Sequence, residues 1–232
     1  MMVKKLVLAS AFVLSMTILS GTAWADNIPI ANASFETPGT SPSTACGTGC
    51  SYNYGPLPGW SVIGGGTWQP GSFFTSPVPD GSLIGFVNAT RSLSQTLTGD
   101  SVLANSVYTL SVFVGDRTDG DSGNYTLSLD TIVGGVTTTL CSFTSNASMI
   151  KSGTFQVEGC TYTSPSSVPS GNLFLQLTAN SGQLDVDNVS LTVQSATTNV
   201  PEPSSVLLLS VGMLLLVATL MVRRKKELQL TA

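Results

Sequence analysis

The chain of 232 residues contains no histidine, and only 9% of its residues are charged. Without histidine, the Ser-His-Asp and Cys-His catalytic arrangements are excluded. Cations are also scarce, with 9 lysines and arginines against 13 acidic residues. A surface of this charge repels the phosphate backbone, so we expect no nucleic acid partner.

Recognisable catalytic motifs are absent from the sequence as well. A glycosidase needs two carboxylates about 5–10 Å apart in a cleft, and none of the acidic residues lies in a motif that would supply such a pair. We therefore predict that the chain is not an enzyme. A glycoside hydrolase remains the enzymatic alternative.

Long apolar runs occur only at the two ends of the chain. At the amino end, Lys4 and Lys5 precede an apolar run from Leu6 to Leu19, and Ala23-Trp24-Ala25 follows. A charged region, an apolar region and an A-x-A site are typical of a secretory signal peptide. We predict a signal peptide over residues 1–25, cleaved after Ala25; the alternative is an uncleaved amino-terminal anchor.

The carboxyl end, residues 200–226, has three parts in a fixed order. Pro201-Glu202-Pro203 is stiff and non-helical. Residues 204–222 carry no charge and, as a helix, would span close to the roughly 30 Å hydrocarbon core of a bilayer. Arg223 and Arg224 follow at once with two lysines, and such a cluster holds its end in the cytoplasm. We therefore expect a membrane helix over 204–222, a cytoplasmic tail over 227–232, and everything before Pro201 outside the cytoplasm.

This order of tripeptide, apolar span and arginines resembles the PEP-CTERM sorting signal of exopolysaccharide-producing Gram-negative bacteria. The matching residues are Pro201, Glu202 and Pro203, then Arg223 and Arg224. The resemblance implies an exosortase-type membrane protease as partner, a transient stay in the inner membrane, and delivery to the cell envelope, the outer surface or the extracellular matrix. The tail after the arginines departs from the family pattern, and a plain membrane anchor is the alternative.

Between the two ends, the domain expected to be exported is acidic and holds four cysteines. Residues 26–199 carry three cations against eleven acids, a net charge of −8, which suits a neutral partner or a divalent cation. Disulfides are the default for cysteines in an exported chain. Three pairings are open; closeness in sequence favours Cys46–Cys50 and Cys141–Cys160. A zinc site is the competing reading, but the tight double spacing of such sites is missing.

Alternating apolar runs separated by Gly, Pro, Asn and Asp fill residues 26–193, and no helical periodicity appears there. About ten short strands of this kind predict an all-β fold, an antiparallel two-sheet β-sandwich, with 194–199 as a polar linker. We expect strands at Ile28 to Phe35, Trp60 to Ile63, Leu83 to Val87, Leu93 to Leu97, Val107 to Val114, Tyr125 to Leu129, Val136 to Phe143 paired with Thr154 to Cys160, Leu173 to Leu177, and Leu184 to Val193, with a loop over Thr37 to Gly59.

The last of these strands contains an irregularity. Val186 and Val189 are three residues apart, yet each belongs to an apolar face of the same strand. The face must therefore switch at Asp187-Asn188, and a β-bulge would do this.

Several stretches resemble the galactose-binding-like jelly roll of carbohydrate-binding modules. They are Asn32-Ala33-Ser34-Phe35-Glu36, Pro58-Gly59-Trp60, Ser94-Gln95-Thr96-Leu97, Tyr108-Thr109-Leu110-Ser111, and residues 184–191 from Leu184 to Leu191. In that family a structural calcium often ties the first strand to the last, and the resemblance implies Glu36 and Asp187 as its ligands. Calcium prefers such oxygen ligands; two solvated acids at strand ends are the alternative.

Two further groups of residues are candidates for binding. Gly115 to Gly123 holds three carboxylates that could bind calcium, although a solvated polar turn fits its spacing better. Aromatic residues are concentrated in the first third of the domain, and their faces can stack on sugar rings. Trp68 with its neighbour Gln69, and Tyr54, are our candidates for glycan contact; packing under the long loops is the alternative.

Taken together, these features predict an exported, non-catalytic envelope or matrix protein associated with exopolysaccharide. A carbohydrate-binding module with a specific glycan is the second hypothesis. No cofactor is expected apart from the candidate calcium.

Overall fold

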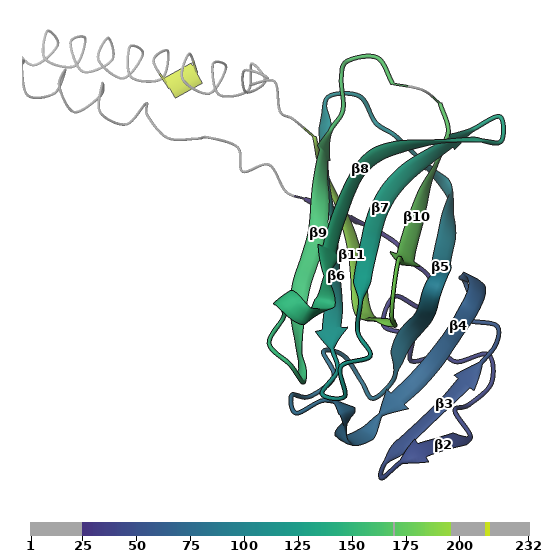
Figure 1. Ribbon diagram of the computed structural model, residues 1–232. Helices are drawn as coiled ribbons and strands as arrows, with labels where there is room; N and C mark the ends of the chain where they lie inside the picture. The colour runs from purple at the N-terminus through teal and green to yellow at the C-terminus, as the bar shows by residue number, and fades with distance from the viewer. Residues whose placement is uncertain (1–24, 169, 196–211, 214–232) are drawn as a thin grey trace, which may run out of the picture. The chain divides into compact units, whose positions relative to one another are not determined.

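The structure, a computed structural model, describes residues 25–168, 170–195 and 212–213 (Figure 1). The chain divides into two compact units, Met1–Ala196 and Thr197–Ala232. All named strands belong to the first unit. In the second unit, Gly212 and Met213 are described, and both are helical.

The first unit is an antiparallel β-sandwich, as predicted. Short 3₁₀ turns, η1 (Gly71–Phe73) and η2 (Ala147–Met149), follow β4 and β8. The strands are β1 (Asp26–Ile28), β2 (Thr44–Gly47), β3 (Cys50–Tyr54), β4 (Ser61–Pro70), β5 (Ile84–Ser101), β6 (Ser106–Asp116), β7 (Asn124–Val133), β8 (Val136–Asn146), β9 (Thr154–Thr163), β10 (Asn172–Ala179) and β11 (Leu184–Ser195).

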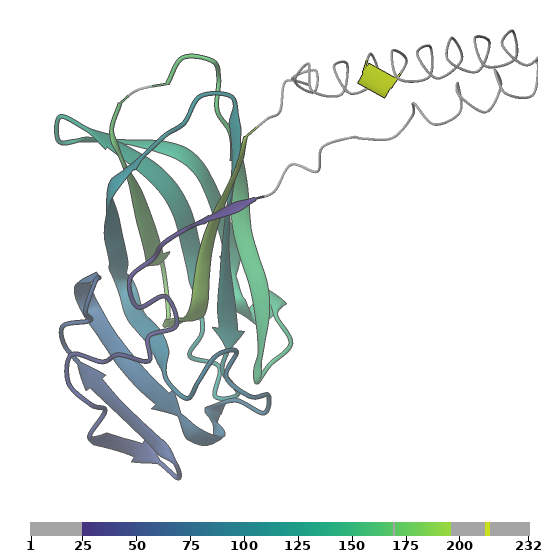
Figure 2. The same ribbon diagram turned by 180° about the vertical axis from the view of Figure 1, so that it is seen from behind.

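The strands form two layers that meet at one point. One layer has the order β2-β3-β4-β5-β10-β7-β8, and the other holds β1, β11, β6 and β9. The first residues of β11 also pair with β5, at Leu184 to Val186, and join the layers there. Figure 1 shows β2, β3 and β4 gathered at one end of the sandwich, and Figure 2 shows β1 lying along β11 from behind.

The main core lies between the two layers. Alternate residues of each strand point inward, as Leu173, Leu175 and Leu177 do in β10, and all three are fully buried. Burial of one such side chain stabilises the fold by roughly 1.5–3 kcal/mol. A second, smaller cluster lies apart from this core and consists of Cys50, Trp68, Phe74, Ile84 and Phe86.

The predicted bulge in β11 is confirmed. The register against β6 shifts between Asp187 and Ser190, and Asn188 takes a positive φ of 44°. As a result both Val186 and Val189 are buried, although they are three residues apart. The extra residue lets one strand keep apolar side chains inward on both sides of the irregularity.

Two expectations near the start of the domain are wrong. The first strand ends at Ile28 rather than Phe35, because the chain turns over residues 31–35, and Phe35 is buried with a φ of 60°. The predicted loop from Thr37 to Gly59 contains the hairpin of β2 and β3. Its Gly, Pro and Cys content concealed two short strands that are completed by pairing with β4.

Two expectations about strand extent and pairing are also wrong. The runs around Leu83 and Leu93 belong to the single 18-residue strand β5, which passes through a positive φ at Thr90. The strands β8 and β9 do not pair with each other: β8 pairs with β7, and β9 pairs with β6. Each is the last strand of its layer. Although the two strands are close in sequence, they therefore belong to different layers and are not hydrogen-bonded partners.

Both predicted disulfides are confirmed. Cys46–Cys50 closes the β2–β3 hairpin, and Cys141–Cys160 joins the edge strands β8 and β9 across the two layers. The four cysteines are thus all paired, and the zinc alternative is wrong.

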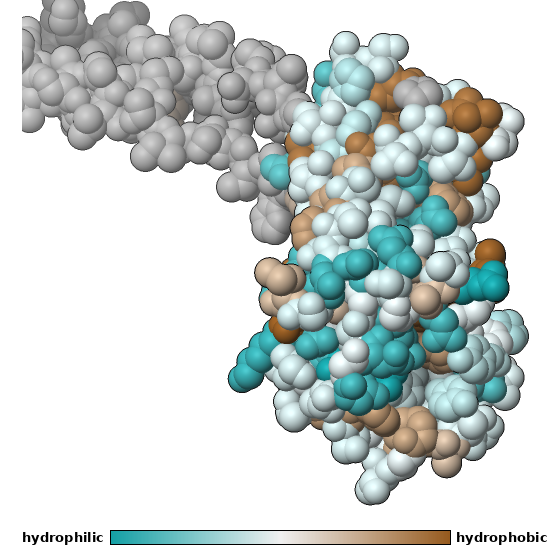
Figure 3. Space-filling model, in the orientation of Figure 1, coloured by the Kyte–Doolittle hydropathy of each residue, from teal (hydrophilic) through white to brown (hydrophobic). Residues whose placement is uncertain are grey.

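The face of the molecule in Figure 3 is mostly hydrophilic or neutral. Its strongest apolar patch lies at the tip of the β7–β8 hairpin, where Val133 and Val136 are exposed. The neutral character of this surface is expected for a chain that is rich in serine and threonine and has few charged residues.

The predicted signal peptide and sorting segment lie outside the described residues, apart from Ala25, Gly212 and Met213. Among the residues that the structure describes, no helix has the length and apolarity needed to cross a membrane.

Candidate functional site

A cavity of about 140 Å³ lies over the second cluster, at the end of the sandwich that carries β2, β3 and β4. Its walls come from four strands, from η1 and from the segments before β7 and β11. Most of these walls are aromatic. The lining residues are Cys46, Tyr52, Tyr54, Trp68, Phe73, Phe86, Arg117 and Gln183.

Strand register brings the aromatic walls together. Tyr52 lies opposite Trp68, while Gly66 lies opposite Tyr54 on one side and Phe86 on the other. The rings of Tyr54 and Phe86, on the two strands that flank Gly66, approach to 5.3 Å between centroids, edge to face. Gly66 itself lies so close to β3 that a Cβ would clash with the backbone of Asn53.

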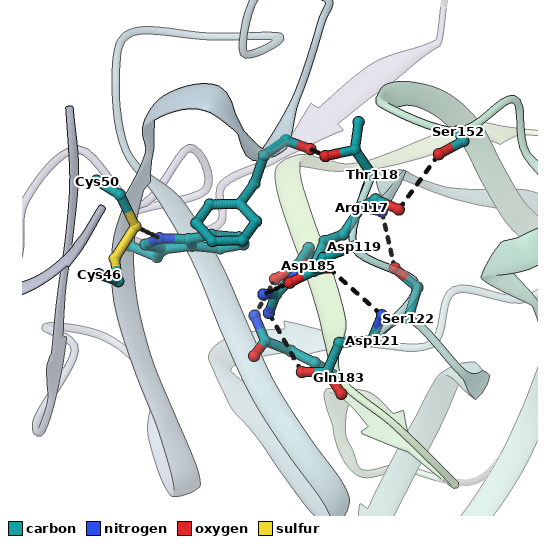
Figure 4. A network of polar contacts seen from close by, with 12 residues as sticks. Cys46, Cys50, Arg117, Thr118, Asp119, Asp121, Ser122, Ser152, Gln183 and Asp185 are labelled. Atoms are coloured by element: carbon teal, nitrogen blue, oxygen red, sulfur yellow. Dashed lines mark hydrogen bonds and ion pairs between the residues drawn. A yellow bond between two sulfur atoms is a disulfide. The ribbon is translucent and has the colours of Figure 1, made fainter. Parts of the chain in front are cut away.

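Trp68 is fixed from both sides. Its indole Nε1 donates a hydrogen bond to Cys50 Sγ at 3.0 Å, and its ring lies 5.4 Å from that of Phe73. The Cys46–Cys50 disulfide therefore forms one flank of the cavity, as Figure 4 shows. A wall held by a disulfide and a cross-strand pair is pre-organised before any ligand arrives.

Arg117 reaches into this aromatic surface from the segment after β6. Its guanidinium carbon lies 4.7 Å from the ring centroid of Trp68 and 4.8 Å from that of Phe73, both cation–π distances. Its Nε and Nη2 donate to the carboxylate of Asp119, and its Nη1 lies 3.4 Å from Asp121. The side chain is only 11% exposed.

Asp185 in β11 adds a fully buried carboxyl next to these residues (Figure 4). Its Oδ1 accepts a hydrogen bond of 2.6 Å from Nε2 of Gln183, a wall residue, whereas its Oδ2 has no hydrogen-bond partner. Burial raises the pKa of this carboxyl to about 7, although Gln183 and the Arg117 guanidinium lower it. The group is therefore largely protonated below neutral pH and can act as a donor.

The candidate calcium ligands lie together at a different place. Asp187 is fully buried, and its two oxygens accept hydrogen bonds from the backbone N–H groups of Asp80 and Asn188. Glu36 accepts from the backbone N–H groups of Ser82 and Leu83. These bonds tie the first turn, the segment before β5 and the last strand together.

The carboxyl groups around Glu36 and Asp187 would favour a bound cation. Burial raises the pKa of Asp187 to about 7, and the nearby carboxylates of Asp80 and Glu36 raise it further against its two backbone hydrogen bonds. No group of three Cys, Asp or Glu side chains suited to a metal occurs in the described part of the chain. A site completed by backbone carbonyls is untested by this, so calcium at Glu36 and Asp187 stays a prediction.

Of the three candidate glycan contacts, Trp68 and Tyr54 line the same cavity, and Gln69 does not. Trp68 is 3% exposed and lines the cavity, and Gln69 is exposed on the other side of the same strand. Tyr54 is 53% exposed, and its hydroxyl accepts a hydrogen bond of 2.8 Å from Asn88. Tyr54 also lines a second, wider hollow of about 420 Å³ with Trp60 and a floor of glycines. A glycan role for the three residues stays a prediction.

Sequence reasoning missed Arg117 and Asp185 as site residues. Arg117 stood in a segment that we expected to be a solvated turn, and Asp185 was noted only as part of the last strand. One signal was available: Arg117 is one of three cations in residues 26–199, and it is flanked by acids.

Comparison with known proteins places this geometry in a family. Residues 26–192 match the family model described as HpiC1-like, HpiC1 cyclase. The chain belongs to the HpiC1-like cyclase family. Residues 199–225 match the PEP-CTERM protein-sorting motif, which confirms the sorting signal and indicates export with membrane-associated processing by an exosortase. Membership in a cyclase family leaves the prediction of a non-catalytic protein unconfirmed.

Solved structures similar to this HpiC1-like chain include cyclases from Fischerella sp. TAU. A Stig cyclase, Fisc, in complex with (3Z)-3-(1-methyl-2-pyrrolidinylidene)-3H-indole is 23% identical with a TM-score of 0.63, and covers 75% of this chain and 100% of its own. A cyclase in complex with 4-(1H-indol-3-yl)butan-2-one is 22% identical with a TM-score of 0.60, over the same shares. At these identities the likeness shows the fold.

A CBM22-1 xylan-binding domain from Paenibacillus barcinonensis is also similar, at 14% identity and a TM-score of 0.44, covering 76% of this chain and 100% of its own. This similarity is too distant to carry an argument about ligands. No curated protein matches the chain.

Proposed function

We propose that this chain is an exported HpiC1-like protein, delivered to the cell envelope through its PEP-CTERM signal, that binds a small planar molecule in the aromatic cavity. The carrying observation is the cavity itself, with walls formed by Trp68, Phe73 and Phe86 beside a fully buried, half-satisfied Asp185. Flat apolar walls with one or two fixed polar groups are typical of sites for small ring compounds.

The size of the cavity limits the ligand. An apolar cavity of about 150 Å³ holds one benzene ring, and the present cavity has about 140 Å³ with Arg117 in place. One ring therefore fits within this volume, and a fused two-ring molecule such as indole would enter by one of its rings. The indole-containing ligands named for the two Fischerella cyclases support a ligand of this planar class.

Asp185 favours a second function, proton-transfer catalysis on the bound molecule. Its protonated carboxyl would donate the proton to an unsaturated carbon, and the resulting cation would face the aromatic walls. A proton then leaves another carbon and returns to the carboxylate. The result is an isomerisation or a cyclisation that needs no oxidant, reductant or cofactor.

Indole tests both functions with one probe. The wild-type full-length chain, purified in mild detergent, should show saturable binding of indole by calorimetry. Trp68→Leu should weaken binding at least about fivefold, because it removes one stacking face worth about 1 kcal/mol or more. Phe143→Leu is the matched control, because it removes a ring from the other cluster. Absence of saturable binding to the wild type would contradict the proposal.

Catalysis is read from the same mixture in D₂O at pH 6. Deuteron transfer from Asp185 to C3 of indole, followed by return of the C3 proton, exchanges that hydrogen without changing the molecule. NMR should show exchange at least about 100-fold faster than in buffer, and Asp185→Asn should return it to the buffer rate while leaving indole bound. Exchange that persists in Asp185→Asn would refute the role of this carboxyl.

Association with exopolysaccharide belongs to the same proposal, as the setting in which the sorted protein works. The wider hollow beside Tyr54 supports it, because Tyr54 offers an exposed ring face with Asn88 next to its hydroxyl. A glycan array probed with the wild type and with Tyr54→Ala measures this directly. Equal signals for the two proteins, or none, would remove the glycan contact.

A further inference from the structure

The wall of the aromatic cavity already contains a planar cation, the guanidinium of Arg117. It lies within 4.8 Å of the ring centroids of both Trp68 and Phe73. The carboxylate of Asp119 accepts two of its N–H groups. Two aromatic rings and a carboxylate along the edge are the surroundings that a bound guanidinium or amidinium ligand would need.

The backbone, rather than these ion pairs, holds Arg117 at the cavity. Its N–H donates to Ser122 Oγ at 2.9 Å, and its carbonyl accepts from Ser152 Oγ at 3.3 Å, as Figure 4 shows. The next residue, Thr118, donates its N–H to the carbonyl of Phe73 at 3.1 Å. The side chain can therefore turn out of the cavity while its backbone stays in place.

The two ion pairs of Arg117 differ in strength. The contact with Asp121 is long, at 3.4 Å, and the Asp121 side chain is 62% exposed, so this pair stabilises little. The pair with Asp119 is bidentate and is the stronger of the two. Asp119 is 36% exposed and so remains within reach of an external cation that presents the same two N–H groups.

The charges around the Arg117 guanidinium are negative once Arg117 itself is set aside. Its ion-pair partners Asp119 and Asp121 remain, and the other cations of the described chain, Arg91 and Lys151, do not line the cavity. Behind the wall residue Gln183, Asp185 has a fully buried oxygen without a hydrogen-bond partner. An anionic ligand in the place of the guanidinium would face the carboxylates of Asp119 and Asp121, whereas a cation would replace Arg117 without loss of neutralisation.

We propose that the place over the contacting rings of Trp68 and Phe73, called the slot below, is a binding site for a planar, delocalised cation of the amidinium or guanidinium type, and that Arg117 is its resident occupant. An external cation of this class takes the place of the Arg117 guanidinium, which turns toward solvent. This inference deepens the proposed function, since it rests on the same cavity and names the charge of the preferred ligand.

Benzamidinium and benzamide test this with full-length protein in mild detergent, because they have nearly the same shape and differ in charge. Arg117→Ala and Arg117→Met both vacate the slot, and the methionine keeps the aliphatic stem. Each should bind benzamidinium at least about tenfold more tightly than the wild type does, with benzamide changed by less than about twofold. Arg91→Ala, which removes an exposed arginine, should behave as the wild type.

An equal gain for benzamide would overturn the inference, because the slot would then be an apolar hole without preference for charge. No gain for benzamidinium in variants that fold would overturn it too. The wild type gives an independent readout if neither variant folds. Ring currents of Trp68 and Phe73 shift the Nε–H resonance of Arg117, and millimolar benzamidinium should abolish that shift. An unmoved resonance under saturation would overturn the inference.

These outcomes are separable from those for the proposed function. If indole fails to bind while benzamidinium gains affinity in Arg117→Met, the planar-neutral ligand and the proton-transfer chemistry are wrong and the cation site stands. If indole binds through Trp68 and benzamidinium gains nothing, the cavity stands and the resident-cation inference is wrong.

Discussion

The buried carboxyl of Asp185 should make the stability of the fold depend on pH. Burial raises its pKa from 3.8 in the unfolded chain to about 7. Between these values the folded chain holds a proton that the unfolded chain has lost. The stabilisation from this group is therefore complete below pH 3.8 and is lost as the pH rises through about 7.

The size of the effect follows from the shift. A change from 3.8 to about 7 amounts to about 4 kcal/mol, at about 1.4 kcal/mol per pKa unit. Asp187, whose pKa is also raised to about 7, adds a slope of the same sign. Asparagine has nearly the shape of a protonated aspartic acid and cannot ionise, so Asp185→Asn should remove one of the two slopes.

The measurement is urea unfolding of the full-length chain in mild detergent between pH 4 and pH 8, with EDTA present so that no divalent ion contributes. Asp185→Asn should match the wild type within about 1 kcal/mol near pH 4. At pH 8 it should be the more stable protein, by up to about 4 kcal/mol.

Two results would refute this reasoning. A difference between Asp185→Asn and the wild type that is independent of pH would mean that the carboxyl titrates alike in both states. A variant that is less stable than the wild type at pH 8 would mean that the native protein uses an ionised Asp185, paired with Arg117 in place of a proton.

Three further predictions concern delivery, disulfides and metal. Deletion of residues 200–232 should release soluble protein from cells, and a truncated chain that stays with the envelope fraction would contradict the sorting role. Replacing Cys141 and Cys160 with serine should lower the free energy of unfolding by about 3 kcal/mol, the loop-closure entropy of a bridge with a separation of 19 residues; denaturant curves that coincide with the wild type would show that the bridge contributes nothing. If Glu36 and Asp187 hold calcium, EDTA should lower the melting temperature and added calcium should restore it, whereas an unchanged melt removes that prediction.

Sequence patterns predicted the strands correctly where only one face of the strand packs against the core. Leu173, Leu175 and Leu177 alternate cleanly with polar residues, and the strand they predict is β10. The two valines of β11 placed a bulge correctly, because a period of two cannot accommodate a spacing of three. Both patterns are properties of a single strand, so they can be read from the sequence without knowing which strands pair.

The sequence did not show which strands pair or which residues pack against each other across the fold. The segment around Cys46 and Cys50 carries few apolar residues, and its strands exist because β4 offers a free edge. Trp68 illustrates the same limit for the candidate site. A tryptophan beside a glutamine is as compatible with a sugar platform as with a buried wall. The ring of Trp68 is buried here because Phe73, Phe74 and Arg117, from other parts of the chain, pack against it.

The two aspartates of β11 show that one strand can give two chemically identical side chains different hydrogen-bond partners. Both are fully buried, and burial raises the pKa of each to about 7. Asp187 stands at the bulge, where Asn188 turns its own N–H back to the carboxylate and Asp80 satisfies the other oxygen. Asp185 lies two residues earlier in regular strand, where neighbouring N–H groups are used by the sheet, so one oxygen remains unpaired. The backbone irregularity thus gives one carboxyl two backbone hydrogen bonds that hold the fold, and it leaves the other with one oxygen unpaired.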